Sequence, residues 1–357
     1  MPFSIRKIGD TTVPAVGFGC MNLSISASSA ADPPPPEDNS LAVLSRAAEL
    51  GTTFWDTSDA YGPSSHNEKL IGRWLAENPG LRSKIFLCTK FGFKLKPSPT
   101  SPIGYEMGID CSPEHVRTAV NASLDRLGVD TIDLVYAHRV DPFVPIEHTV
   151  AAMAELVHAG KVRYIGLSEC SATTLRRAYK IHPIAAIQME FSPWALDLED
   201  PQIGILTAAR ELDVKIVTYS PLGRGWLTNA KIEKWEDLEP FVGKIRMSVH
   251  PRFSREAFEG NLRLKRGLEE MAKEKGVSVG QLTLAWVLSQ GDDFIAIPGT
   301  KTLKYLEDNA GAREVDFTAE DEAQVRSILK ATGGAQGARY SEAFLKACFG
   351  DTPALEE

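Results

Sequence analysis

Cysteine is scarce in this chain of 357 residues, and the few that occur lie far apart. There are five, an odd number, with no C-x-x-C pair and no spacing typical of zinc ligands. These absences argue against a disulfide framework and against a metal site, so we predict no metal ligands. They also favour a reducing compartment, and we expect a cytoplasmic protein.

Positive charge is also in short supply. Lysine and arginine number 39 against 47 aspartates and glutamates, a net charge of −8, and no block of like charges occurs. Because polyanions bind basic patches, we expect neither nucleic acid nor an acidic membrane surface as a partner. Eighteen consecutive apolar residues occur nowhere, and the N-terminus lacks the apolar core of a signal peptide. The sequence therefore predicts no membrane span and no secretion by that route.

What the chain has is an apolar pattern that alternates between short strand-like runs and helices of 3.6-residue period. Hydrophobic residues make up 43% of the chain, enough for a full core. The expected strands are residues 16–21, 53–58, 85–92, 132–139, 162–168, 185–192, 215–221 and 294–299. Eight strands, each followed by a helix and joined without a Ser/Gly-rich linker, predict an α/β protein with a single (β/α)8 TIM barrel over residues 1–357.

An open, doubly wound sheet is the alternative architecture. Against it, no G-x-G-x-x-G follows the first strand, since the segments 17–22 and 223–226 have the wrong spacing. Helix signals agree with the barrel: Ser112-Pro113 is typical of a helix start, and Ser278 with Gln281 predicts a capping box. Thr318 with Asp321 resembles another box after the eighth strand, which predicts an extra C-terminal helix.

Three segments lie outside the repeat. Residues 1–15 hold two short alternating runs around Gly9-Asp10, which predict a β-hairpin that caps one end of the barrel. The four prolines Pro33–Pro36 predict an extended surface loop, which is either a spacer or a proline-motif ligand. The tail, residues 334–357, predicts a loop followed by a short amphipathic piece.

Four polar residues end or follow neighbouring strands, where the active site of a barrel lies: Asp56, Tyr61, Lys90 and His138. Each also has an ordinary structural interpretation, as a turn residue, a rim tyrosine, a snorkelling lysine or a satisfied histidine. Together they predict proton chemistry. A free tyrosine has a pKa near 10. An ammonium held by a carboxylate would lower that pKa, and an imidazole could orient a substrate carbonyl toward the hydroxyl.

Longer stretches then identify a resemblance to a known family. The segments 54–62, 89–93, 133–141, 162–169, 219–228, 251–253 and 297–309 follow one another in the order seen in the aldo-keto reductases. The likeness spans nearly the whole chain and is greatest to the fungal and plant branch with pyridoxal reductases and auxin-induced-type reductases. The resemblance implies a barrel that binds NADPH without a Rossmann domain and a catalytic tetrad of Asp56, Tyr61, Lys90 and His138, with tyrosine as general acid.

The resemblance also implies a cofactor groove. Ser168 and Gln188 match positions that hold the nicotinamide carboxamide, and Tyr219 matches the aromatic residue on which the ring stacks. The loop residues Ser220, Leu222, Gly223 and Gly225 are expected at the pyrophosphate. Gly299, Thr300 and Lys301 are expected at the 2′-phosphate, and Asp308 and Asn309 at the adenine. Glu169 departs from the asparagine of many relatives, although this branch often has glutamate there.

The expected function is NADPH-dependent reduction of an aldehyde or ketone, with a small-molecule carbonyl compound as partner. The alternative is a cofactor-binding regulatory subunit that resembles potassium-channel β subunits, which keep the tetrad. Substrate choice is expected in the loops 22–36, 93–111 and 226–252 and in the tail. Three aromatic residues could form a wall there or pack in the core: Phe91, Trp194 and Trp226. The identity of the substrate, the preferred direction and the oligomeric state, a homo-oligomer included, are left open by the sequence.

Overall fold

Eight parallel strands form one sheet in a computed structural model that describes residues 5–25, 34–98, 105–228 and 230–355. Each expected run contains one of these strands, so all eight are confirmed. In chain order they are β3 (Phe18–Gly19), β4 (Phe54–Asp56), β5 (Phe86–Phe91), β8 (Ile132–Ala137), β9 (Val162–Ser168), β10 (Ala186–Glu190), β11 (Lys215–Tyr219) and β12 (Phe294–Ala296). Each strand pairs with its neighbour in that order.

The sheet closes on itself where the first strand meets the last. The amide of Gly17 donates to the carbonyl of Ala296 at 2.8 Å, and Gly19 donates to Pro298 at 3.1 Å. A Cβ atom at Gly299 would lie only 2.9 Å from the carbonyl oxygen of Gly19, so this crossing needs a glycine. The closed barrel rules out the open sheet that the sequence left as the alternative architecture.

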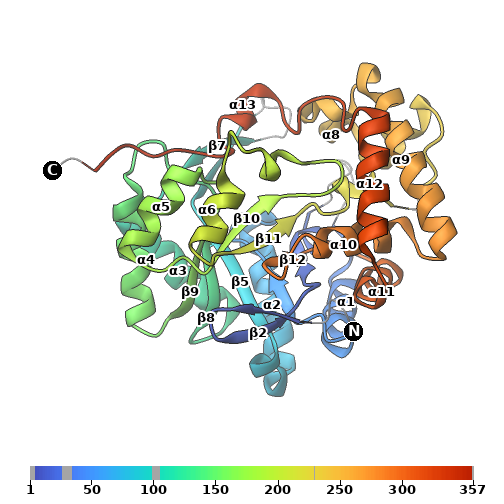
Figure 1. Ribbon diagram of the computed structural model, residues 1–357. Helices are drawn as coiled ribbons and strands as arrows, with labels where there is room; N and C mark the ends of the chain where they lie inside the picture. The colour runs from blue at the N-terminus through green and yellow to red at the C-terminus, as the bar shows by residue number, and fades with distance from the viewer. Residues whose placement is uncertain (1–4, 26–33, 99–104, 229, 356–357) are drawn as a thin grey trace.

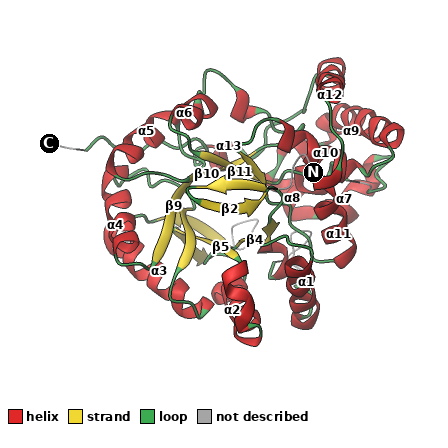
Figure 2. Ribbon diagram, turned by 60° about the horizontal axis from the view of Figure 1, so that its bottom comes forward, coloured by secondary structure: helices red, strands yellow, loops and turns green. Residues whose placement is uncertain are grey.

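Helices surround the barrel, as the view down its axis shows (Figure 2). The eight that follow the strands are α1 (Glu37–Glu49), α2 (His66–Glu77), α3 (Pro113–Leu127), α4 (Ile146–His158), α5 (Ala172–Ile181), α6 (Ile205–Glu211), α10 (Val279–Ser289) and α11 (Leu303–Gly311). Ser112 caps α3, and Ser278 with Gln281 forms the expected capping box of α10. No helix in the described part of the chain is long and apolar enough to cross a bilayer.

The N-terminal hairpin closes one end of the barrel. Strands β1 (Ile5–Ile8) and β2 (Thr11–Pro14) pair in antiparallel fashion across the lower end in Figure 1. Arg6 fastens the hairpin by donating to the carbonyls of Phe294, 3.0 Å away, and Leu288, 3.1 Å away. The hairpin expected over residues 1–15 is thus found, with its first four residues outside the described ranges.

The extra helix at the end of the repeat is α12 (Ala319–Thr332), which begins with the capping box of Thr318 and Asp321. It packs on α9 (Arg255–Lys275), a helix that follows the expected loop 226–252 and for which the sequence analysis made no prediction (Figure 1). The remaining elements are the hairpin β6 (Phe93–Pro97) and β7 (Tyr105–Ile109), two short helices α7 (Leu238–Val242) and α8 (Lys244–Val249), and α13 (Glu342–Leu345) in the tail. Pro34–Pro36 lead into α1, whereas Pro33 lies outside the described residues.

Candidate active site

The four polar residues of the expected tetrad converge at the C-terminal end of the barrel. Asp56 ends β4, Lys90 lies near the end of β5, His138 follows β8 and Tyr61 lies in the loop after β4. The Lys90 ammonium donates to Asp56 Oδ1 at 2.5 Å and to the Tyr61 hydroxyl at 3.0 Å. It also donates to the carbonyl of Thr57 at 2.8 Å, so all three of its protons are directed. One buried cation thus joins the carboxylate to the phenol.

Burial decides the acidity of the tyrosine. It raises the pKa of Tyr61 above the ordinary value, and this effect outweighs the lowering by the nearby Lys90 ammonium. The expectation of a net lowered pKa is therefore wrong for the protein without substrate, because charge is costly away from water. Burial also opposes the charge of Lys90, but Asp56 and Tyr61 outweigh it and raise the pKa of the lysine. At neutral pH the pair is a protonated phenol beside an ammonium.

The imidazole of His138 is neutral. Burial, aided by Lys90 and Arg139, lowers its pKa well below the ordinary value. Its Nδ1 lies 3.1 Å from the hydroxyl of Ser58, a residue that the sequence analysis did not single out. The ring meets Tyr61 edge-on with centroids 5.8 Å apart, and Phe93 at the base of the β6–β7 hairpin packs 4.4 Å from it.

Two residues expected at the nicotinamide carboxamide lie side by side on β9 and β10. Ser168 pairs in register with Gln188 and donates its hydroxyl to the Gln188 carbonyl at 3.0 Å. The Gln188 side chain donates to Asp56 Oδ2 at 2.8 Å, so it supports the tetrad in this structure. Tyr219, at the end of β11, donates its hydroxyl to Glu169 at 2.9 Å.

The expected pyrophosphate loop follows β11 directly. Ser220, Gly223 and Gly225 have positive φ values of +49°, +56° and +94°, and the two glycines bound a 3-10 turn over Gly223–Gly225. A Cβ at Gly223 would lie 2.9 Å from the Trp194 ring, so packing as well as conformation requires glycine there. Leu222 lies beside the start of α10, which brings this loop to the residues expected around the nucleotide.

The residues expected at the 2′-phosphate and the adenine gather around the start of α11. Thr302 caps this helix, and Lys301 just before it is exposed. Asp308 accepts the hydroxyl of Ser278 at 2.8 Å, which ties α11 to α10, and Asn309 is buried. A helix N-terminus beside an exposed lysine suits a phosphate group.

The proposed aromatic wall is part of the core. Trp194 and Trp226 are 2% and 1% exposed and stack with centroids 5.6 Å apart, and Phe91 is 1% exposed. These three side chains therefore pack in the core, whereas Phe93 contacts His138 beside Tyr61. The hairpin that carries Phe93 had no signal in the sequence beyond the length of its loop.

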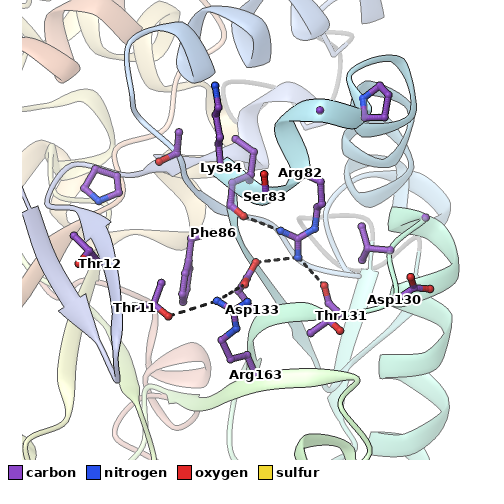
Figure 3. Close-up of a pocket in the computed structure, with 17 residues that line it drawn as sticks. Thr11, Thr12, Arg82, Ser83, Lys84, Phe86, Asp130, Thr131, Asp133 and Arg163 are labelled. Atoms are coloured by element: carbon purple, nitrogen blue, oxygen red, sulfur yellow. Dashed lines mark hydrogen bonds and ion pairs between the residues drawn. The ribbon is translucent and has the colours of Figure 1, made fainter.

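A pocket of about 650 Å³ lies at the opposite end of the barrel, beside the N-terminal hairpin (Figure 3). Two of its arginines share one carboxylate: Asp133 accepts from Arg82 at 2.9 Å and lies 3.3 Å from Arg163. The Asp133 carboxylate also accepts a hydrogen bond from the amide of Leu87, so it links the starts of β5 and β8. In barrels this end carries stability, so we do not assign chemistry to it.

Comparison with known proteins shows which family the chain belongs to. Residues 15–330 match the model of the aldo/keto reductase family. This chain belongs to that family. It is 45% identical over 358 residues to the aldo-keto reductase yakc of Schizosaccharomyces pombe, whose name specifies NADP(+), with 99% of each chain covered. It is 47% identical over 331 residues to the aldo-keto reductase str7 of Strobilurus tenacellus, with 92% of this chain and 93% of that one covered.

Solved structures share the barrel. The glycerol dehydrogenase AKR11B4 of Gluconobacter oxydans superposes with a TM-score of 0.76 at 27% identity, over 93% of this chain and 97% of the other. Membership of the aldo/keto reductase family confirms the resemblance and the oxidoreductase class that the sequence suggested. In general terms it supports carbonyl reduction as the reaction.

Proposed function

We propose that the protein reduces an aldehyde or ketone to the alcohol with NADPH, and that Tyr61 is the general acid. The observation that carries this proposal is the buried phenol 3.0 Å from the Lys90 ammonium, at the mouth of the barrel beside His138. The relative yakc, named for NADP(+), supports the choice of cofactor.

The residues around the mouth fit such a cofactor. Ser168, Gln188 and Tyr219 would hold the nicotinamide, the loop after β11 the pyrophosphate, and the start of α11 the 2′-phosphate. The exposed Lys301 has no acidic partner among the described residues, so its charge is available to a phosphate. When bound, the cofactor supplies the hydride.

The chain's own groups then move the proton. His138, neutral because of its low pKa, donates a hydrogen bond from Nε2 to the substrate oxygen if Ser58 donates to Nδ1. As hydride reaches the carbonyl carbon, the C=O electron pair moves to oxygen, which takes the proton of Tyr61. The phenolate left behind is stabilised by Lys90 until it is protonated again from solvent.

Burial is central to this assignment. Because it raises the pKa of Tyr61, the phenol keeps its proton through the neutral range and is present in the form a general acid needs. The ammonium contributes most once the phenolate forms, since opposite charges then attract at short range in a dry site. Phe93 gives the substrate an apolar wall against the imidazole.

The regulatory-subunit alternative draws no support from the relatives named above, which are reductases or a dehydrogenase by name. Single-turnover oxidation of bound NADPH by a small aldehyde separates the two functions. A wild-type protein that oxidises NADPH only over minutes with every carbonyl compound tried would favour the regulatory subunit.

Tyr61→Phe tests the general acid. We expect kcat to fall by about 10²–10⁴-fold with NADPH affinity nearly intact, because only the transferable proton is removed. The matched control is Tyr164→Phe, which removes a hydroxyl bonded to Asp10 at the far end of the barrel. Retention of more than about half of the wild-type kcat, with chemistry rate-limiting, would refute the assignment.

A further inference from the structure

The C-terminal tail returns to the mouth of the barrel after α12. It is fastened to Glu169 and Ser171, on either side of Cys170 in the segment that follows β9. The amide of Gly350 donates to the Glu169 carbonyl at 2.7 Å, and the amide of Ser171 donates to the Gly350 carbonyl at 2.9 Å. The tail thus extends the barrel edge at the end of β9 like a short extra strand.

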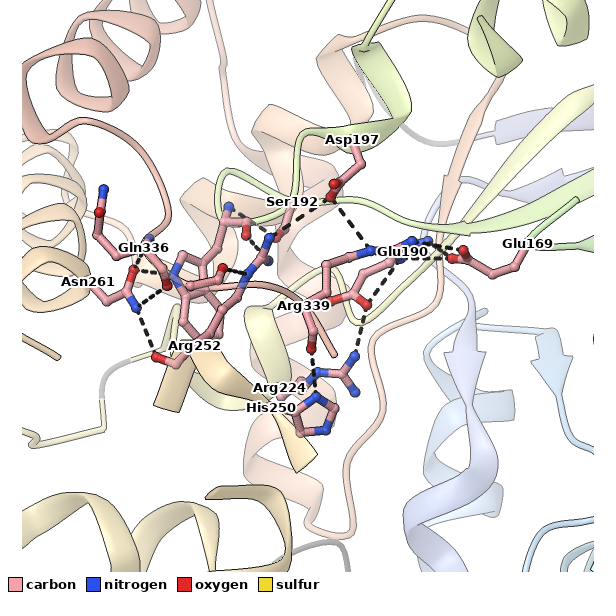
Figure 4. A network of polar contacts seen from close by, with 12 residues as sticks. Glu169, Glu190, Ser192, Asp197, Arg224, His250, Arg252, Asn261, Gln336 and Arg339 are labelled. Carbon is pink, nitrogen blue, oxygen red and sulfur yellow. Dashed lines mark hydrogen bonds and ion pairs between the residues drawn. The ribbon is translucent and has the colours of Figure 1, made fainter. Parts of the chain in front are cut away.

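Arg339 of the tail forms a buried ion pair with Glu169. Its two terminal nitrogens each lie 2.9 Å from one carboxylate oxygen of Glu169, a bidentate geometry (Figure 4). The two side chains are 2% and 0% exposed. Burial opposes the charge on Glu169, but Arg339 outweighs it and lowers the pKa of the carboxyl to about 2. The pair is therefore charged at neutral pH.

The Glu169 carboxylate also binds Tyr219, the residue expected to stack on the nicotinamide. Glu169 Oε1 accepts the hydroxyl of Tyr219 at 2.9 Å and the amide of Glu190 at 3.2 Å. The backbone of Glu169 has a φ of +52°, a conformation that a residue with a Cβ adopts only when its surroundings hold it. Arg339, Glu169 and Tyr219 thus form one chain of bonds from the tail to the tyrosine ring.

A second set of contacts steadies the arginine. Arg339 also lies 3.4 Å from Glu190, which accepts from Arg224 at 2.8 Å (Figure 4). The neighbouring Tyr340 lies between the guanidinium of Arg224, 4.7 Å from its ring centre, and the hydroxyl of Tyr219, 3.3 Å from its own. The guanidinium of Arg339 is therefore held by both Glu169 and Glu190.

We propose that Arg339 is a positioning residue for the nicotinamide half of the cofactor. Through Glu169 it holds the Tyr219 hydroxyl, and so sets the angle of the ring that stacks on the nicotinamide. This inference rests on the proposed function, because it takes Tyr219 as the stacking residue. The tail, which the sequence analysis expected to border the substrate, is then also part of the cofactor site.

The tail has another anchor, which supplies a matched control. Arg177 on α5 pairs with Glu147 at 2.7 Å and donates to the carbonyl of Thr352 at 2.9 Å. Among the described residues, none of its bonds reaches Glu169 or Tyr219. Arg177→Met therefore loosens the tail without touching the chain of bonds that the proposal uses.

The experiment compares two probes by equilibrium binding: NADPH, and adenosine 2′,5′-bisphosphate, which lacks the nicotinamide. For Arg339→Met we expect NADPH affinity to fall about tenfold or more, as for a lost charge-assisted contact, while the bisphosphate binds as to wild type. Tyr219→Phe should weaken NADPH selectively, by roughly two- to tenfold, because the ring keeps its stacking face and loses only the bond that holds its angle. Arg177→Met should leave both affinities unchanged.

Arg339→Met leaves a buried carboxylate unpaired and can fail to fold. The double variant Glu169→Gln/Arg339→Met removes both charges and keeps an acceptor near Tyr219, and Tyr219→Phe changes no charge at all. Equal losses for both probes, or unchanged NADPH affinity in Tyr219→Phe, would overturn the proposal. A wild type that binds both probes but oxidises NADPH with no carbonyl compound would refute the proposed reduction and leave the binding comparison intact.

Discussion

Lys90 shows how much of the site depends on one side chain. It is fully buried, and its three protons go to a carboxylate, a backbone carbonyl and a phenol. A lysine in that position is retained only because Asp56 compensates its charge, since an unpaired buried charge is strongly destabilising. The same pairing explains why the ammonium can act on Tyr61 at close range.

Lys90→Met separates structural pairing from catalysis. We expect a folded fraction whose single-turnover oxidation of NADPH by a reactive aldehyde is slower by about 10²–10⁴-fold, because no ammonium stabilises the phenolate. A thermal melt of the same sample reports the stability loss from the unpaired Asp56.

The double variant Asp56→Asn/Lys90→Met is the control for that loss. It leaves no buried charge at this position, so it should melt closer to wild type and remain slow. Fast hydride transfer in either folded variant would mean that the lysine has only a structural role.

At the scale of elements, the ends of strands and the start of one helix do most of the positioning. Parallel strands bring residues from β4, β5 and β9–β11 to one rim, although they lie far apart in the sequence. Helix α11 adds the backbone amides of its first turn, of which that of Tyr305 is capped by Thr302. The exposed Lys301 stands just before these amides.

Lys301→Ala tests whether this helix start reads the 2′-phosphate. Loss of a charge-assisted contact should weaken NADPH by roughly 10–150-fold and leave NADH almost unchanged. Lys304→Ala, which removes a lysine one turn further along α11, is the matched control for the net charge. Equal losses for NADPH and NADH in Lys301→Ala would assign the lysine to something other than the phosphate.

At the scale of the whole molecule, the barrel and its tail bury histidines in neutral form. Burial lowers the pKa of His250 to about 3, and its Nδ1 is bonded to the carbonyl of Arg339 at 2.7 Å. In the unfolded chain a histidine has a pKa near 6.5 and takes up a proton below that pH. In the folded state His250 stays unprotonated down to about pH 3. The free energy of unfolding is therefore highest above pH 6.5 and decreases as the pH falls below that value.

His250→Asn should make the fold less sensitive to acid. Between pH 7 and pH 5 we expect the wild type to lose about 2 kcal/mol more of its free energy of unfolding than the variant, which has no proton to take up there. Urea unfolding at the two pH values gives the comparison. His158→Asn, at an exposed position on α4, should behave as wild type, and an undiminished acid sensitivity in His250→Asn would contradict the assignment.

The sequence by itself determined the repeat and which four polar residues meet at the barrel mouth. Buried strands such as β5 and β8 are mostly apolar runs, and caps such as Ser112 and Ser278 mark helix starts through local hydrogen bonds. Polar residues directly after such runs must meet at one end of a closed barrel, so Asp56, Lys90 and His138 could be grouped in advance. These features depend on residues close together in the chain.

Tertiary structure alone decided what burial and distant contacts control. The pKa of Tyr61 depends on how dry its surroundings are, and that is set by the whole mouth of the barrel. The role of Glu169 depends on Arg339, 170 residues further along the chain, and no local pattern marks that pairing. The hairpin that carries Phe93 likewise has exposed, weakly alternating strands, so only the structure reveals that its base packs on His138.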